Sequence, residues 1–112
     1  MANLSNPATA NQAAFGQLGS AFANTAAAVI QPPSGKAIVA IQFLGDTKFD
    51  TLTAEDQSQC FGINDTTQGA GSGGLTVDSG DIFPKGLTIY GRWTHVSLQA
   101  NQLTDGIICY FG

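Results

Sequence analysis

Residues 81–93, DIFPKGLTIYGRW, join a turn to an alternating run of side chains. The Pro-Lys-Gly segment is typical of a β-turn, because proline presets one backbone angle and glycine tolerates the unusual ones. From Leu87 to Trp93 the side chains alternate as they do in a strand, where successive residues point to opposite faces. The alternation predicts Tyr90 and Arg92 on one face and Trp93 on the other, in the core.

The rest of the chain after residue 35 repeats this pattern of short apolar runs between turn residues. The run at 36–44 is apolar on both sides, which is typical of a central strand, and the run at 107–112 closes the chain. Shorter strands are expected at 48–53, 60–63, 75–77 and 94–99, the last either continuing the strand before it or pairing back on it. Roughly six to eight short strands at hairpin spacing predict an all-β fold, a small antiparallel β-sandwich or barrel.

Residues 1–34 differ from this pattern, since they contain no charged side chain and end near a Pro-Pro pair. Within them Phe15, Leu18 and Phe22 have the i, i+3, i+7 spacing of a helical apolar stripe. Nearby glycines weaken such a helix, and a short helix is marginal by itself. We therefore divide the chain into an N-terminal arm at 1–34, extended or partly helical, and a β domain at 35–112. The arm is either a loosely packed tail or a segment that orders when it docks on a partner.

The composition restricts the classes of partner. Charged residues are 11% of the chain, against roughly 25% in an average soluble protein. A mostly neutral surface favours a subunit that packs against copies of itself or against another protein. The net charge of −4 and the absence of a basic stripe argue against nucleic acid. No apolar run approaches the roughly 20 residues of a membrane helix, so we expect no membrane partner. The N-terminus lacks the features of a secretory signal, so we expect synthesis in a cytoplasm.

Residues that carry chemistry are sparse. His95 is the only histidine and no catalytic partner is implied for it, while the aspartates are scattered singly through turns. The glycines at 69, 71 and 74 have the spacing of a dinucleotide-binding loop, but a strand rather than a helix is expected after them. We therefore expect no enzyme, no cofactor and no metal site. Cys60 and Cys109 match no metal motif, and their setting favours free thiols, although their pairing stays open.

Two stretches carry a resemblance to a known family. Residues 43–52, FLGDTKFDTL, resemble the F-x-x-D-T-x-F-x-x-L stretch of small virion structural proteins from tailed bacteriophages, including marine phages of cyanobacteria. Residues 83–93, FPKGLTIYGRW, are similar to the stretch that these proteins place before a terminal strand running from glycine to tyrosine, here residues 106–110. The resemblance covers residues 36–112 and leaves out the arm.

The resemblance implies a capsid decoration or cement protein that stabilises the phage head. Its expected partners are the major capsid protein and copies of itself, as a homotrimer on the capsid surface of virions assembled in the host cytoplasm. Tyrosine and arginine are enriched at interface hot spots. The alternative is a module of a tail fibre, neck or head fibre that contacts a host receptor or glycan. The candidate contact residues are Phe15, Leu18, Phe22, Tyr90 and Arg92.

Overall fold

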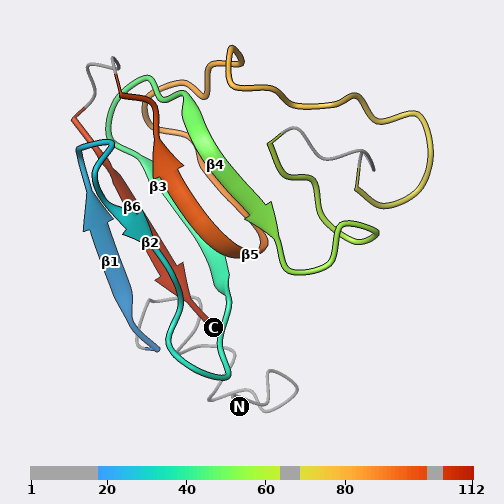
Figure 1. Ribbon diagram of the computed structural model, residues 1–112, viewed down its shortest axis with the longest axis horizontal. Coiled ribbons are helices and arrows are strands. Elements are labelled where there is room, and N and C mark those ends of the chain that lie inside the picture. Colours follow the sequence, from blue (N-terminus) through green and yellow to red (C-terminus); the bar gives the residue numbers. More distant parts are fainter. Residues whose placement is uncertain (1–17, 64–68, 101–104) are drawn as a thin grey trace.

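A computed structural model describes residues 18–63, 69–100 and 105–112, and it confirms the all-β prediction (Figure 1). Every pairing between its strands is antiparallel. No helix occurs in the described residues. The strands are β1 (Ser20–Ala23), β2 (Val29–Ile30), β3 (Ile38–Phe43), β4 (Phe49–Ala54), β5 (Thr88–Leu98) and β6 (Ile107–Phe111).

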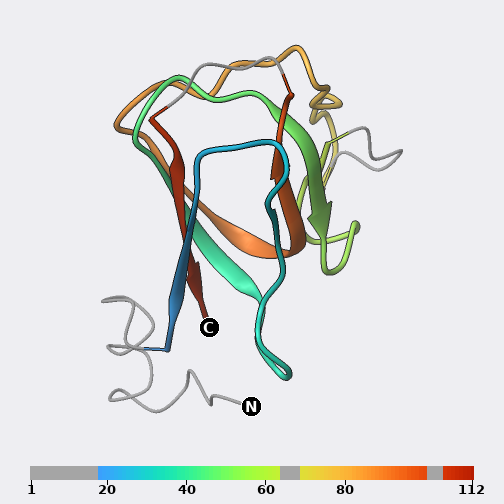
Figure 2. The ribbon, with the colours of Figure 1, turned by 60° about the vertical axis from the view of Figure 1, so that its left-hand side comes forward.

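The long strand β5 connects the two halves of the sheet. The strand order is β1-β6-β3-β5-β2, and β4 also pairs with β5. The first half of β5 pairs with β3, whereas its second half pairs with β2 and β4. Because one strand of 11 residues belongs to both halves, the sheet curls until it is nearly closed into a barrel (Figure 2). Residues 94–98 thus continue the strand that begins at residue 88 and do not fold back on it.

The strand register determines which side chains point inward. Residues directly opposite each other in an antiparallel pair share a face. The inward positions on β6 and β3 include Ile107, Cys109, Ile41 and Phe43, each at most 1% exposed. The apolar C-terminal strand β6 lies between β1 and β3, so it is not an edge of the sheet.

Trp93 occupies the core, as predicted, with no exposed surface. Its indole Nε1 donates a hydrogen bond to the carbonyl oxygen of Phe61 at 2.8 Å, and the two rings meet edge to face with centroids 5.8 Å apart. Gly91 precedes it on the same side of β5. A Cβ atom at Gly91 would lie 2.6 Å from the Sγ of Cys60 and 2.7 Å from the Trp93 ring, so only glycine allows this packing.

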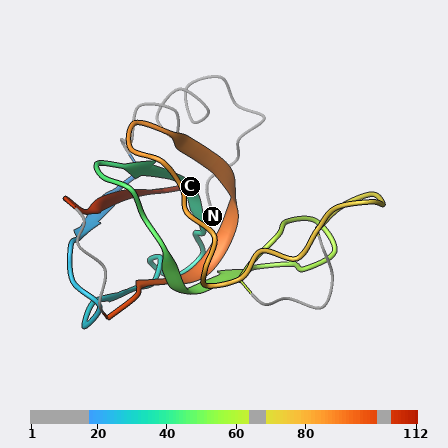
Figure 3. The same ribbon diagram turned by 90° about the horizontal axis from the view of Figure 1, so that it is seen from above.

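Phe83 anchors the long connection between β4 and β5. Its ring centroid lies 5.3 Å from that of Phe43 and 5.3 Å from that of Phe49. Its backbone exchanges two hydrogen bonds of 2.8 Å with Thr47. Within the connection, residues 55–63 and 69–80 extend together to one side of the barrel (Figure 3). The strands expected at 60–63 and 75–77 are reduced there to one parallel bridge between Ile63 and Val77.

The predicted helical stripe is wrong in its described part. Phe22 lies on β1 and stands opposite Ile108 of β6. The backbone groups of β1 are paired with a neighbouring strand, and this tertiary pairing overrides a weak local periodicity that glycines already disfavoured. The predicted arm boundary also divides one sheet, because β1 and β2 lie before residue 34 and pair with β6 and β5. Phe15 lies outside the described residues.

We expect Gly91→Ala to lower the free energy of unfolding by about 1–3 kcal/mol, because the added methyl group overpacks the contact with Trp93 and Cys60. Urea denaturation followed by tryptophan fluorescence measures this. Thr88→Ala, at a half-buried position of the same strand, is the control and should change the free energy by less than about 1 kcal/mol. Equal stability of Gly91→Ala and the wild type would contradict the packing described.

Both cysteines are free, as the sequence favoured, but we expect their reactivities to differ. Burial raises the pKa of the Cys109 thiol to about 12, so this group stays protonated at neutral pH, and the thiolate is the reactive form. Cys60 is only partly buried. Ellman's reagent at pH 8 should therefore label Cys60 in the folded protein and Cys109 only after denaturation. Cys60→Ser should abolish the reaction of the folded protein, and rapid labelling of that variant would contradict the burial of Cys109.

Candidate functional site

Eight outward positions on β1, β6, β3 and β5 form a surface without charged side chains. Because directly opposite residues share a face, the register aligns two outward rows across these four strands. We call these eight positions the uncharged face. The first row is Phe22, Ile108, Gln42 and Thr88, and the second is Ser20, Tyr110, Ala40 and Tyr90.

Two exposed aromatic side chains stand at opposite sides of the uncharged face. Phe22 on β1 is 55% exposed and Tyr90 on β5 is 77% exposed. Three strand spacings of about 4.8 Å place these strands roughly 14 Å apart. Between them the hydroxyl of Tyr110 donates to Oε1 of Gln42 at 3.2 Å, which orders the middle of the face. Exposed aromatic groups on a neutral surface are typical of a contact with another protein.

Phe22 is held in place by a glycine beneath its ring. Gly106 has a φ of +112°, and a Cβ atom there would lie 2.7 Å from Cε1 of Phe22 and 2.8 Å from the carbonyl oxygen of Ala23. The ring therefore packs directly on the backbone that leads into β6 while its other side stays exposed. The sequence spacing of Phe22 predicted a helix, and only the pairing of β1 with β6 reveals its true setting.

The structure brings only some of the predicted contact residues together. Phe22 and Tyr90 lie on the uncharged face, and Arg92 lies beside it. Leu18 precedes β1 and holds no position in the two rows. Its carbonyl oxygen accepts a hydrogen bond from Nζ of Lys36 at 2.8 Å, which ties the start of β1 to the segment before β3.

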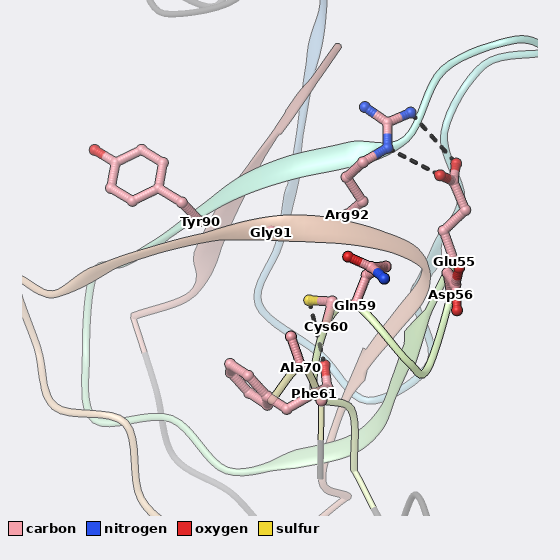
Figure 4. A pocket seen from close by; sticks show the side chains of 10 residues that line it. Glu55, Asp56, Gln59, Cys60, Phe61, Ala70, Tyr90, Gly91 and Arg92 are labelled. Carbon is pink, nitrogen blue, oxygen red and sulfur yellow. Dashed lines mark hydrogen bonds and ion pairs between the residues drawn. The ribbon is translucent and has the colours of Figure 1, made fainter. Parts of the chain in front are cut away.

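Arg92 projects from the same side of β5 as Tyr90, as the alternation predicted (Figure 4). Its Nε lies 2.9 Å from Oε1 of Glu55 and its Nη2 lies 3.4 Å from Oε2, so the two groups form a forked ion pair. The hydrogen bond from Arg92 holds the pKa of Glu55 below its ordinary value, and the positive charge acts in the same direction. Glu55 was missed from the sequence because it lies 37 residues from Arg92 and only the pairing of β4 with β5 joins them.

A groove of about 520 Å³ opens beside this ion pair (Figure 4). One wall is β5 at Tyr90, Gly91 and Arg92, and the other is formed by the loop that follows β4 together with residues 69 and 70. Cys60 packs against Gly91 and, with Phe61, supplies the apolar part of the lining. Polar side chains surround this apolar part of the lining. Tyr90 belongs both to the groove and to the uncharged face.

Asp56 shapes the loop that borders the groove. Its Oδ1 accepts hydrogen bonds from the backbone N–H of Ser58 at 2.9 Å and from the Ser58 hydroxyl at 2.7 Å. The hydroxyl bond and then the backbone bond lower the pKa of Asp56, so this carboxylate stays ionised at neutral pH. The carbonyl oxygen of Asp56 accepts the N–H of Gln59 at 3.0 Å, which presents the Gln59 side chain to the groove.

The described residues hold no group of three or more His, Cys, Asp or Glu side chains that could bind a metal ion. His95 is exposed, and its Nδ1 lies 3.0 Å from the hydroxyl of Thr94. Over the same part of the chain there is no helix of the length and hydropathy needed to cross a membrane. Comparison with known proteins finds no matching family model, no matching curated protein and no matching solved structure.

We expect the titration midpoint of Glu55, followed by carboxyl carbon NMR, to lie below the ordinary value of 4.5. Arg92→Gln should raise it, whereas Lys85→Gln should leave it unchanged. Because the folded pKa is depressed, the ion pair stabilises the fold above the unfolded pKa, and this contribution is lost as the pH falls through the folded pKa. The contribution is small because both groups are partly exposed. An unchanged midpoint in Arg92→Gln would contradict the pairing.

Proposed function

We propose that this chain is a bacteriophage virion structural protein, a capsid decoration protein that binds the major capsid protein and neighbouring copies through its uncharged face. The observation that carries the proposal is the exposure of Phe22 and Tyr90 on a sheet face without charge. The resemblance of residues 36–112 to small virion proteins of tailed phages supports the same class of function.

The uncharged face suits permanent contact with another protein for a physical reason. Burying a charged group requires the loss of its hydration, which is costly unless the group finds a partner, and these eight positions carry no charge to bury. Apolar burial contributes roughly 25 cal/mol per Å². Aromatic anchors such as Phe22 and Tyr90 concentrate that contribution.

The distribution of charge favours the uncharged face as the place where several copies would meet. Each chain carries a net charge of −4, so copies repel each other at long range. Contacts between uncharged faces avoid bringing like charges together at short range. A homotrimer of decoration subunits at each threefold position would then repeat a modest contact over the whole shell, and the sum of these contacts would resist the pressure of packaged DNA.

The copy number in purified particles of the phage that encodes the chain tests the proposal. Quantitative mass spectrometry should give a ratio to the major capsid protein of one or a simple fraction of one. A few copies per particle would instead indicate a fibre or neck module. Absence from the particle would overturn the proposal.

We expect Phe22→Ser to weaken binding to capsids that lack the protein by about tenfold or more, since truncating an aromatic anchor removes over about 1.4 kcal/mol. Val29→Ser is a matched control, because Val29 is 53% exposed but lies on β2, outside the uncharged face. Tyr90→Ala, at the opposite side of the face, should weaken binding as well. Binding of both Phe22→Ser and Tyr90→Ala at the wild-type level would exclude the uncharged face as the contact.

A further inference from the structure

We propose that the groove beside Gly91 binds a neutral saccharide unit, with Tyr90 as the stacking ring and Gln59, Glu55 and Arg92 as partners for hydroxyl groups. This site shares Tyr90 with the proposed capsid contact, whereas Gln59 and Glu55 hold no position on the uncharged face. Its volume of about 520 Å³ falls within the range of roughly 300–1,000 Å³ that small-molecule sites occupy.

The backbone of β5 adds a donor and an acceptor to this groove. The carbonyl oxygen of Leu87 accepts the N–H of Phe43, so the backbone groups of every second residue from Leu87 onward face β3. Those of Tyr90 therefore face the opposite edge, where the Arg92 carbonyl accepts the N–H of Glu55 at 2.9 Å. Within the described residues, no strand pairs with this edge at Tyr90. As far as the described residues go, the backbone N–H and C=O of Tyr90 are therefore open to a ligand.

The bond from Glu55 to the Arg92 carbonyl also ends the groove, because the ladder between β4 and β5 begins there. The free part of the edge is therefore short. An extended peptide that adds a strand needs a longer row of backbone groups. A compact ligand of one or two rings fits this length better.

The charges of the groove disfavour an anionic ligand. Glu55 and Arg92 form an ion pair and largely cancel each other, while Asp56 keeps a negative charge at the rim. A phosphate or another anion would be repelled by that excess. The carboxylate of Glu55, the guanidinium of Arg92 and the amide of Gln59 are planar groups that carry several hydrogen-bond donors and acceptors. Such groups suit the adjacent hydroxyls of a sugar.

Tyr90 supplies the apolar part of the recognition. A pyranose ring has a face of C–H groups and a rim of hydroxyls. Tyr90 is 77% exposed and is one of the residues that line the groove, and its ring projects outward from β5 at the mouth of the groove (Figure 4). A sugar that stacks on this ring would therefore lie at the mouth and turn its hydroxyls toward the polar side chains. Tyrosine offers this contact at small entropic cost because few of its bonds rotate.

Saturation-transfer NMR on the full chain with maltose, cellobiose, lactose and chitobiose, each at millimolar concentration, tests the proposal. At least one of these probes should receive saturation, and sialyllactose, the anionic comparator, should not bind better than lactose. Tyr90→Ala and Gln59→Ala should each weaken binding about fivefold or more, whereas Tyr90→Phe, which keeps the ring, should retain it. No transfer to any probe, or wild-type binding in both Tyr90→Ala and Gln59→Ala, would overturn the site.

Two further variants separate this site from the capsid contact. Phe22→Ser should keep sugar binding and weaken capsid binding, because Phe22 lies on β1, away from the groove. Gln59→Ala should do the reverse, because Gln59 holds no position on the uncharged face. Loss of both activities in Gln59→Ala, with the fold intact by circular dichroism, would contradict two separate sites.

Discussion

The packing of Trp93 against Gly91 is the contact on which the rest of the structure depends. Trp93 lies where β5 changes partners, since it pairs with Ile38 of β3 and with Ala54 of β4. Its indole N–H is satisfied by the carbonyl of Phe61, so the tryptophan also holds the loop after β4 against the barrel. The same contact that fills the core therefore places one wall of the groove.

Strand β5 serves both surfaces because of its alternation. The inward residues of β5 build the core, while Tyr90 and Arg92 point outward. Tyr90 belongs to the uncharged face, and both residues also line the groove. The uncharged face carries no charged side chain. At the groove the charges of Glu55 and Arg92 balance each other in an ion pair. A domain with few charged residues can thus offer an uncharged contact surface and a small polar site side by side.

The N-terminal part shows where local patterns mislead. Phe22 has helical spacing relative to Leu18, but Ser20–Ala23 forms β1 because β6 provides a partner for its backbone. A periodicity of so few residues is a weak signal, and hydrogen bonding to a neighbouring strand outweighs it. The strand predicted at residues 87–93 was confirmed, with β5 beginning at Thr88, because its alternation coincides with β-branched and aromatic residues and follows a clear turn.

The sequence alone determined the all-β class, the burial of Trp93, the shared side of Tyr90 and Arg92 and the scarcity of charge, because these follow from composition and from alternation between near neighbours. Only the tertiary structure decided the place of β1, the pairing of Glu55 with Arg92 and the alignment of Phe22 with Ile108. These depend on register between strands that lie far apart in the chain. A shift of one residue would turn every side chain of a strand to the other face, and no local pattern specifies that register.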